Sequence, residues 1–299
     1  MMSVDLLNER FKQTNRIEFQ AGPNDLTFSR LKSEHGQVDV FLHGGHVTDL
    51  ILNGNPVLWL SPETNYQPGK AIRGGIPVCW PWFGPHPENP DLPSHGFARN
   101  MNWEVAATSV TNHCPGIRLQ LESDDVTRKI WPHEFRLELK IELDHQLSVS
   151  LKATNLNESQ AFVVGGALHS YFCIDNIDHV QLTGLDAVSY ADQLDSMNVK
   201  QQSGPIAFDG EVDRVYLETD HAVTLQDGSR KVFIEKSGSL STVIWNPWIE
   251  KTARMGDMPA DAYQNMVCVE TSNALSDVRS LEPGESHQFQ QAISLISDK

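Results

Sequence analysis

The chain has 299 residues, and 39 acidic against 23 basic side chains give it a formal charge of −16. This acidic balance argues against the basic face that a nucleic-acid-coating or membrane-surface protein requires, so we expect neither kind of partner. Hydrophobic residues make up 39% of the chain without any apolar run of about 18 residues, which indicates a folded protein without a membrane-spanning helix.

The N-terminal run 4–13, VDLLNERFKQ, predicts a helix from the spacing of its apolar residues. Acidic residues stand where a secretory signal peptide needs a basic start and an apolar stretch, which favours a cytoplasmic protein. No repeat, charge block or linker divides the chain, so we interpret 1–299 as a single domain with an N-terminal extension at 1–16. We expect a monomer.

Short runs in which apolar and polar residues alternate recur along the chain and predict β-strands. The clearest run, 135–143, places five large apolar side chains on one face, and 147–154 repeats the pattern after a hairpin-sized gap. Helical spacing is weak, with one further short candidate at 260–265. Many short strands and few short helices indicate an all-β fold, a large antiparallel β-sandwich or barrel. The predicted strands are 38–43, 46–52, 116–122, 135–143, 147–154, 231–236, 241–246, 266–270 and 287–296.

Four cysteines, Cys79, Cys114, Cys173 and Cys268, are far apart and form no CxxC pair. A chain of this length needs no disulfide framework for stability, so we interpret them as reduced, mostly buried thiols. Cys173 and Cys268 lie within apolar runs, which favours packing over reactivity.

The segment 66–99 is dense in glycine, proline and aromatic residues. It cannot form a regular sheet or helix, because proline removes backbone donors and glycine relaxes the backbone dihedral angles. A long loop in a compact protein is usually functional or disordered, and the aromatic side chains of Trp80, Trp82 and Phe83 argue against disorder. We therefore expect a rigid, packed loop at a site.

His169 lies in the run 163–174, VVGGALHSYFCI, which alternates with a period of two. One set of alternate residues, Val164, Leu168 and Phe172, fits the core, and the opposite set contains His169. The preceding Gly-Gly pair leaves space on that second face, as in a cleft that admits a ligand. The alternative is a histidine whose hydrogen bonds are satisfied within a sheet.

Glu270 ends the apolar strand predicted at 266–270. A carboxylate there would be partly desolvated, which raises its pKa toward the range of a general base. The alternative is a glutamate at a strand end that points into water.

Several cations and one acid in loops or turns are candidates for ligand binding. Glycines adjoin Arg73 in IRGG and His95 in SHGFAR, and they let the backbone approach a ligand closely. The guanidinium groups of Arg73 and Arg99 match a phosphate or carboxylate with two parallel hydrogen bonds. Asp213 could accept hydrogen bonds from sugar hydroxyls. The alternatives are structural loop arginines and an exposed turn at 213–214.

Cofactor and metal motifs are missing from the chain. Among twelve histidines the nearest spacings are His43 with His46 and His86 with His95, and neither matches a zinc-binding pattern. Gly74-Gly75 is not followed by the lysine of a phosphate-binding loop, and neither a dinucleotide fingerprint nor a GxSxG nucleophile motif occurs. We therefore expect no metal and no cofactor.

Five segments together resemble the aldose 1-epimerase superfamily and, within it, the hexose-6-phosphate mutarotase, or glucose-6-phosphate 1-epimerase, branch. The resemblance covers roughly residues 20–295, in the order of the family. It implies a single β-sandwich of the galactose mutarotase type, with the site on a concave sheet face. The segments are RGGIPVCWPWFGP at 73–85, SHGFAR at 94–99, LHSYF at 168–172, DRVY at 213–216 and CVET at 268–271.

The resemblance implies interconversion of the α and β anomers of a hexose 6-phosphate, most directly glucose 6-phosphate, without metal or cofactor. By family correspondence, Glu270 is the base at the C1 hydroxyl and His169 the acid at the ring oxygen. The correspondence gives a substrate-binding role to five further residues: Arg73 and Arg99 for the 6-phosphate, Asp213 for hydroxyls, His95 beside the ring, and Ser94, where relatives can carry Gln, as a ligand contact.

Two alternatives to a phosphosugar mutarotase remain. A mutarotase of free aldoses would use the same acid and base but would need no pair of arginines at C6. A non-catalytic carbohydrate-binding protein could use Trp80, Trp82 and Phe83 as stacking platforms, although at least one is expected in the core. The presence of both His169 and Glu270 argues against pure binding.

Overall fold

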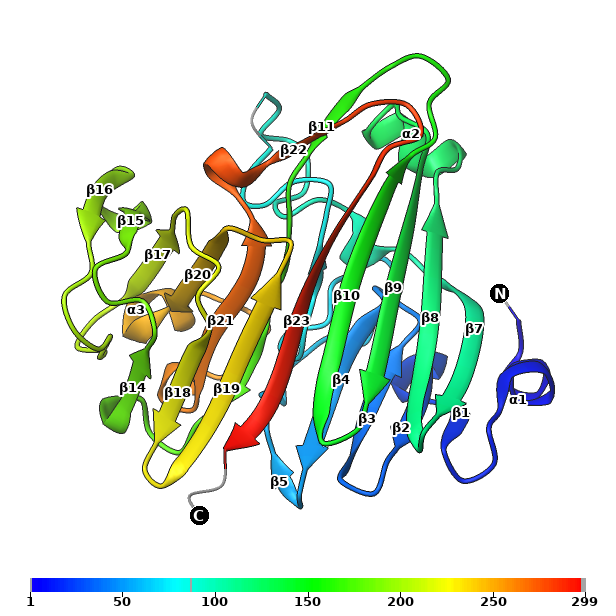
Figure 1. Ribbon diagram of the computed structural model, residues 1–299, viewed down its shortest axis with the longest axis horizontal. Helices are drawn as coiled ribbons and strands as arrows, with labels where there is room; N and C mark the ends of the chain where they lie inside the picture. The colour runs from blue at the N-terminus through cyan, green and yellow to red at the C-terminus, as the bar shows by residue number, and fades with distance from the viewer. Residues whose placement is uncertain (1, 87, 297–299) are drawn as a thin grey trace.

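A computed structural model describes residues 2–86 and 88–296 of the chain, and these residues form mostly antiparallel β-strands. The first sheet, called here the N-terminal sheet, has five strands in sequence order (Figure 1). They are β1 (Ile17–Ala21), β2 (Thr27–Lys32), β3 (Gly36–Phe41), β4 (His46–Leu52) and β5 (Asn55–Pro56).

The second sheet, called here the outer sheet, has eight strands and faces the viewer in Figure 1. In spatial order they are β14 (Val180–Thr183), β18 (Val223–Asp227), β19 (Arg230–Ser237), β23 (Ser286–Ile296), β10 (Gln146–Asn155), β9 (Phe135–Leu143), β8 (Cys114–Glu122) and β7 (Glu104–Thr111). The alternation in 135–143 matches the burial of β9, because every second residue of this strand is buried while those between are more exposed.

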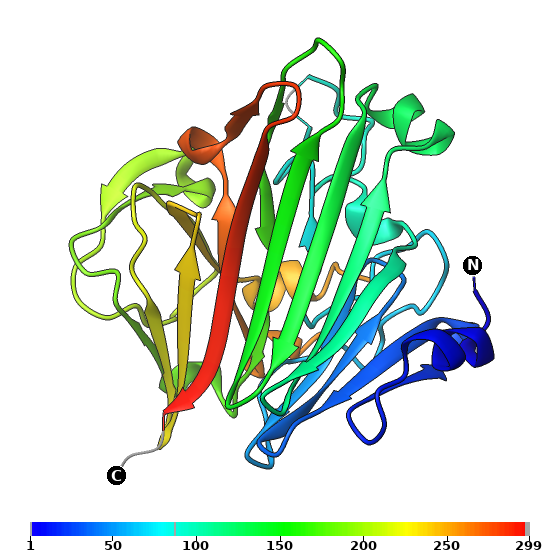
Figure 2. The ribbon, with the colours of Figure 1, turned by 45° about the vertical axis from the view of Figure 1, so that its right-hand side comes forward.

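The third sheet, called here the site sheet, also has eight strands, seven of them on one path, and lies behind the outer sheet, as the views in Figures 1 and 2 agree. Its path contains β16 (Asn198–Gln201), β15 (Ser189–Asp192), β17 (Val212–Tyr216), β20 (Ser241–Asn246), β21 (Met266–Asn273), β12 (Gly166–Leu168) and β6 (Val78–Cys79). Beside it, β13 (Tyr171–Cys173) pairs with β21, and β11 (Phe162–Val164) forms a separate ribbon with β22 (Arg279–Leu281).

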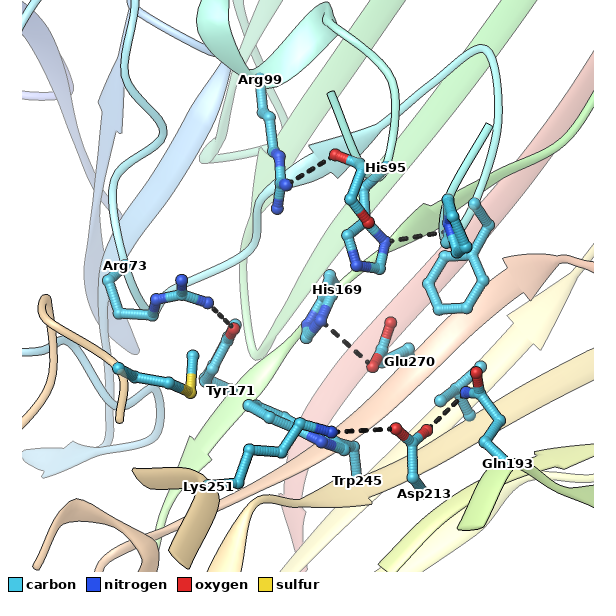
Figure 3. A pocket seen from close by; sticks show the side chains of 16 residues that line it. Arg73, His95, Arg99, His169, Tyr171, Gln193, Asp213, Trp245, Lys251 and Glu270 are labelled. Carbon is cyan, nitrogen blue, oxygen red and sulfur yellow. Dashed lines mark hydrogen bonds and ion pairs between the residues drawn. The ribbon is translucent and has the colours of Figure 1, made fainter. Parts of the chain in front are cut away.

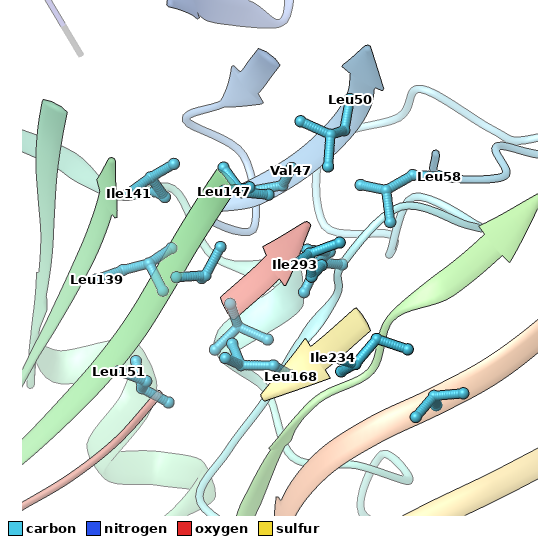
Figure 4. Packing of buried hydrophobic residues seen from close by; sticks show 14 of the residues in the cluster. Val47, Leu50, Leu58, Leu139, Ile141, Leu147, Leu151, Leu168, Ile234 and Ile293 are labelled. Carbon is cyan, nitrogen blue, oxygen red and sulfur yellow. The ribbon is translucent and has the colours of Figure 1, made fainter. Parts of the chain in front are cut away.

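The largest apolar cluster joins all three sheets (Figure 4). Leu139 and Ile293 of the outer sheet belong to the same buried cluster as Val47 of the N-terminal sheet and Leu168 of the site sheet. The other sheets therefore both pack against the outer sheet, and the polar face of the site sheet is left for function. This is the all-β sandwich that the strand pattern predicts, and that prediction is confirmed.

Helices are few and short: α1 (Val4–Phe11), α2 (Asp125–Ile130) and α3 (Trp248–Thr252). The helix predicted at 4–13 begins as expected and ends two residues early. The helix predicted at 260–265 is wrong, because only one 3₁₀ turn forms there, at Ala262–Gln264. The described residues contain no helix long and apolar enough to cross a lipid bilayer.

Two irregular segments shape the site. The run 163–174 forms three short strands, β11 to β13, in place of one continuous alternation, and His169 lies at the break between the second and third. The loop 66–99 contains only the two-residue strand β6 and the start of a 3₁₀ turn at Ala98–Asn100, yet Trp80 within it is 1% exposed. The prediction of a packed, non-regular loop is confirmed.

Candidate active site

A cavity of about 330 Å³ opens on the site sheet (Figure 3). All seven residues that the sequence singles out line it: Arg73, Ser94, His95, Arg99, His169, Asp213 and Glu270. Four of them come from the loop 66–99 and three from the sheet, so the loop forms one wall and the sheet the floor. Residues separated by nearly 200 positions in the chain are thereby brought around one space.

His169 and Glu270 face each other at the floor of the cavity, with 3.4 Å between His169 Nε2 and Glu270 Oε1. The side chain of His169 is 8% exposed and that of Glu270 is 1% exposed. Pairing of β13 with β21 sets Tyr171 opposite Cys268, which brings the break before β13 beside the end of the apolar run. Tyr171 also stacks on the imidazole ring, 4.8 Å between centroids at 11°.

Burial shapes the protonation of this pair. It lowers the pKa of His169 well below its ordinary value, and the positive charges of Arg99 and Arg73 act in the same direction. Burial also raises the pKa of Glu270 well above its ordinary value, and the charge of Asp213 adds to the rise. Both shifts favour the form in which the pair holds one proton on Glu270 while His169 is neutral.

One atom of each partner is left for a ligand. Glu270 Oε2 and His169 Nδ1 are buried and have no hydrogen-bond partner among the described residues. A buried carboxyl oxygen without a hydrogen-bond partner is costly, because its desolvation is not compensated. A hydroxyl group bound in the cavity would relieve this cost at Glu270.

A buried glutamine supports the pair from behind the sheet. Gln291 of β23 is fully buried, and its Oε1 accepts a hydrogen bond of 2.5 Å from Ser170 Oγ. Its amide nitrogen donates to Val269 O at 3.2 Å and to Thr271 Oγ1 at 3.1 Å. Ser170 and Thr271 are the sequence neighbours of His169 and Glu270, so one side chain of the outer sheet links the two segments that carry the pair.

His95 is held as a neutral donor at the edge of the cavity. Its Nδ1 accepts a hydrogen bond of 3.2 Å from the amide of Gly84, so in the neutral ring the proton is on Nε2. Burial and the nearby charges of Arg99 and Arg73 lower the pKa of His95 to about 3. The ring centroid lies 5.6 Å from that of His169. A neutral His95 can therefore donate one hydrogen bond to a ligand beside the acid–base pair.

Gly96, next to His95, explains why this loop needs glycine. Its φ angle is +69°, and a Cβ atom would lie 2.0 Å from the carbonyl oxygen of Trp80. Any other residue would clash with the backbone that carries Trp80 and the cis bond to Pro81.

The two arginines differ in their partners. Arg73 is held by Asp257, with Nε and Nη2 at 3.0 and 2.9 Å from Asp257 Oδ2, and its Nη1 donates to Tyr171 Oη at 3.0 Å. Arg99 donates through Nη2 to the carbonyl oxygen of Ser94 at 2.8 Å. Within the described part of the chain no acidic side chain pairs with Arg99. Of these two arginines, Arg99 is therefore the one whose positive charge has no acidic partner among the described residues.

The backbone at Gly74, next to Arg73, is fixed by a histidine from the N-terminal sheet. His46 of β4 is fully buried, and its Nε2 lies 2.7 Å from the carbonyl oxygen of Gly74. Burial lowers the pKa of His46 to about 3, so the ring is neutral and donates this hydrogen bond. The backbone next to Arg73 is thereby anchored to a second sheet.

Asp213 lies on the far side of the acid–base pair from the two arginines (Figure 3). Gln193 Nε2 donates to its Oδ1 at 2.5 Å, and Lys251 Nζ lies 3.4 Å from its Oδ2. Sequence reasoning missed Gln193, Lys251 and the cavity-lining Trp245. Trp245 stands on a correctly predicted strand, whereas the other two come from short elements that give no periodic signal.

The aromatic residues of the loop 66–99 divide between two roles. Trp80 and Trp82 belong to the buried core, with 1% and 7% exposure. Phe83 lines the cavity, and its ring lies 4.8 Å from that of His95. The carbohydrate-binding alternative therefore loses two of its three stacking platforms to core packing.

Glu270, His169 and Cys268 form one group whose possible ligand atoms all lie within 4.8 Å of one another. A metal would require Cys268 as a thiolate. Burial, and then the charge of Glu270, raise the pKa of that thiol well above its ordinary value, and Cys268 packs in the sheet opposite Tyr171 and Trp245. These three residues do not fit a metal site.

Comparison with solved structures shows the class of fold. The structure is similar to that of a galactose mutarotase related enzyme from Lactobacillus acidophilus, with a TM-score of 0.72 over 90% of this chain and 97% of that one, at 16% identity. The fold is therefore that of the galactose mutarotases, a large antiparallel sandwich with its site on one sheet.

The sequence profile of the aldose 1-epimerase family matches residues 29–294, and the chain belongs to this family of isomerases acting on sugars. Proteins named "putative glucose-6-phosphate 1-epimerase" from Salmonella typhimurium and Cenchrus ciliaris are 35% and 34% identical over 86% of this chain, and over 87% and 81% of their own lengths. The crystal structure of a Salmonella typhimurium protein described as a "putative mutarotase (YeaD)" is 30% identical, with a TM-score of 0.88 over 96% of both chains.

Proposed function

We propose that this enzyme interconverts the α and β anomers of hexose 6-phosphates, glucose 6-phosphate foremost, by acid–base opening and closure of the ring. The observation that carries the proposal is the buried His169–Glu270 pair, which shares one cavity with Arg99, an arginine that has no acidic partner among the described residues. The names of the relatives from Salmonella typhimurium and Cenchrus ciliaris agree with it.

The reaction needs one base and one acid. Glu270 removes the proton from the C1 hydroxyl while His169 gives a proton to the ring oxygen, and the bond between C1 and the ring oxygen breaks to give the aldehyde. Rotation about C1–C2 presents the other carbonyl face, and reversal of both transfers closes the ring as the other anomer. Ring opening requires the shared proton on His169, so this proton first passes from Glu270 to His169 across the 3.4 Å between Oε1 and Nε2. The two transfers of ring opening then leave Glu270 protonated and His169 neutral again, and no proton is gained or lost overall. Each positioned group contributes about 10²–10⁴-fold.

We infer the orientation of the substrate in the cavity from the charged side chains at the two ends. We place the 6-phosphate beside Arg99, with Arg73 and the loop around Ser94 close by, and the ring hydroxyls toward Asp213 on the other side of the pair. His95 donates its Nε2 proton to a hydroxyl near the ring oxygen. A charge-assisted hydrogen bond from an arginine to phosphate is stronger than one between neutral groups.

A mutarotase of free aldoses is the second candidate, and the Arg73–Asp257 ion pair is the observation that favours it. An arginine already neutralised by an acid adds less attraction for phosphate, so the predicted pair of phosphate-binding cations reduces to one. The two candidates share the acid and the base and differ only in what Arg99 binds.

The test is anomer exchange measured by NMR magnetisation transfer on glucose 6-phosphate, with free glucose and galactose run beside it. We expect enzyme-dependent exchange on the phosphosugar at concentrations where the free sugars show little. Exchange on free sugars alone would overturn the phosphate assignment and keep the acid–base pair. A folded sample that exchanges none of them would overturn the enzyme proposal altogether.

We further propose that the chain acts in the cytoplasm as a single-domain monomer. One chain supplies all seven site residues, so catalysis requires no second copy. The four cysteines are free, as expected in a reducing compartment. Light scattering of the purified protein at activity-assay concentrations tests the monomer, and a mass of twice 33.4 kDa would contradict it.

A further inference from the structure

Asp213 is held from two sides by residues outside its own strand. Gln193 lies in a 3₁₀ turn, Gln193–Asp195, and engages one carboxylate oxygen, while Lys251 of α3 lies against the other. Lys251 is itself fixed, because its Nζ lies 2.8 Å from Glu211 Oε1 and 5.6 Å from the centroid of the Trp245 ring. Figure 3 shows the ammonium group and the carboxylate facing each other across the edge of the cavity.

Lys251 is the strongest of the neighbours that favour the ionised form of Asp213. Burial raises the pKa of Asp213 and the charge of Glu211 adds to the rise, while Lys251 and then Gln193 oppose it. Glu270 and the thiol of Cys268 also face this carboxylate from β21, and both feel its charge. Lys251 is the cation within hydrogen-bond reach that offsets these acidic neighbours.

Lys251 keeps its own charge in this position. Burial acts to lower its pKa, but the hydrogen bond to Glu211 and the charge of Asp213 outweigh burial, so the pKa lies above its ordinary value. The ammonium group has three protons and two acidic partners, so neither acid is left unpaired.

We propose that Lys251 is a positioning residue that sets sugar specificity, by holding Asp213 as a carboxylate aimed at one hydroxyl of the substrate. The proposal rests on the proposed function, because it assigns the ligand of Asp213 as a sugar hydroxyl. An ionised acceptor binds a hydroxyl more tightly than a neutral carboxyl group, which can itself donate its proton. Sugars lacking that hydroxyl gain nothing from the ion pair.

A merely structural role is the competing explanation, since Lys251 could serve only to tie α3 to Glu211. The chain offers a matched pair of variants that separates the two. Lys251→Met removes the charge near Asp213, and Glu211→Gln reduces the tie from an ion pair to a hydrogen bond with a neutral acceptor while leaving Lys251 beside Asp213. Lys251→Arg keeps the charge and is expected to restore function.

Steady-state anomer exchange on glucose 6-phosphate between pH 5.5 and 9 tests the proposal. For Lys251→Met we expect KM to rise about tenfold or more, the effect of weakening one hydrogen bond to a charged group, with kcat within about threefold of the unsubstituted enzyme. Without the ammonium group, Asp213 holds its proton to higher pH, so the raised KM of Lys251→Met falls again as pH increases. Glu211→Gln and Lys251→Arg are expected to stay within about threefold at every pH. Equal losses in Lys251→Met and Glu211→Gln would overturn the proposal.

Deoxy analogues of glucose 6-phosphate identify the hydroxyl. One analogue is expected to bind the unsubstituted enzyme more weakly than the parent sugar, and this penalty should disappear in Lys251→Met below neutral pH. If no analogue is penalised, Asp213 does not bind a hydroxyl and the proposal is wrong.

A readout without turnover keeps the proposal separate from the proposed function. Carbon NMR can follow the carboxyl group of Asp213, assigned by its loss in Asp213→Asn, during a pH titration. We expect the midpoint to move upward in Lys251→Met and to stay in Glu211→Gln or move slightly downward. An unchanged midpoint in Lys251→Met overturns the proposal even if the enzyme is active, and a shift supports the charge effect even if glucose 6-phosphate proves to be the wrong substrate.

Discussion

An ion pair holds a charged side chain at each end of the cavity, and that side chain is positive at one end and negative at the other. At one end Asp257 holds Arg73, and at the other Lys251 holds Asp213. The difference is Arg99, which adds a cation without an acidic partner among the described residues. In a chain of net charge −16, that leaves one end suited to an anion and the other to neutral hydroxyls. The ion pairs therefore orient Arg73 and Asp213, whereas the unpaired charge of Arg99 favours an anionic ligand at its end of the cavity.

The largest effect should come from the pair between the ends. Glu270→Gln removes the base without changing either end, so we expect kcat to fall by about 10²–10⁴-fold with KM nearly unchanged. NMR exchange on glucose 6-phosphate gives kcat, and calorimetric titration gives the binding constant. Loss of binding in step with activity would show that Glu270 holds the sugar instead of moving a proton.

The cation end should discriminate between phosphorylated and free sugars. Arg99→Ala is expected to weaken glucose 6-phosphate binding by about 10- to 100-fold, the loss of hydrogen bonds to a charged group, and to leave free glucose unaffected. Binding constants for both sugars check this. Arg214→Ala is a suitable control, because that guanidinium lies over the Tyr190 ring, 4.8 Å from its centroid. Equal losses for both sugars would contradict a phosphate role for Arg99.

A change at Asp257 should make the cation end stronger. Asp257→Asn keeps an acceptor for Arg73 and removes the negative charge, so inorganic phosphate and glucose 6-phosphate are expected to bind a few-fold tighter. Competition by inorganic phosphate in the exchange assay measures this directly. Weaker binding in Asp257→Asn would mean that the ion pair aligns Arg73 more than it neutralises the charge.

The smallest effect concerns stability. Folding raises the pKa of Glu270 above its unfolded value, so the stability linked to its proton is complete below the unfolded pKa and is lost as pH rises toward the folded pKa. Glutamine does not titrate, so Glu270→Gln should gain stability relative to the unsubstituted protein between pH 5 and 9. A gain of about 1 kcal/mol corresponds to roughly 2 °C in Tm. The exposed Glu250→Gln serves as control, and a pH-independent difference would contradict the burial effect.

The alternation of apolar and polar residues is enough to predict several of the strands. The strands predicted at 46–52 and 241–246 coincide with β4 and β20, because burial on one face imposes the period that the sequence displays. The missed helix α3 has only five residues, begins after Pro247 and contains Trp248 at a φ of +53°, so no helical period develops. The sequence does contain a local signal for α2, the capping box in which Asp124 and Thr127 bond reciprocally.

The site was predictable only in part, because local sequence patterns do not show which distant residues pair with each other. His169 and Glu270 stand in apolar strand patterns, where a polar residue is conspicuous, and the family resemblance supplied their roles. The partners that set the charge balance are far away in sequence: Asp257 is 184 residues from Arg73, and Lys251 is 38 residues from Asp213. Such pairings depend on the order of strands in the sheet, which local patterns do not contain.

Lys251 and Asp257 belong to one short stretch of chain, and each reaches a different end of the cavity. A single contiguous exchange across residues 248–257 would therefore alter the partners of Asp213 and of Arg73 together, while His169 and Glu270 keep their own supports in β21 and β23. We therefore expect an exchange in this stretch to change substrate preference at both ends of the cavity without removing the anomer exchange that we propose.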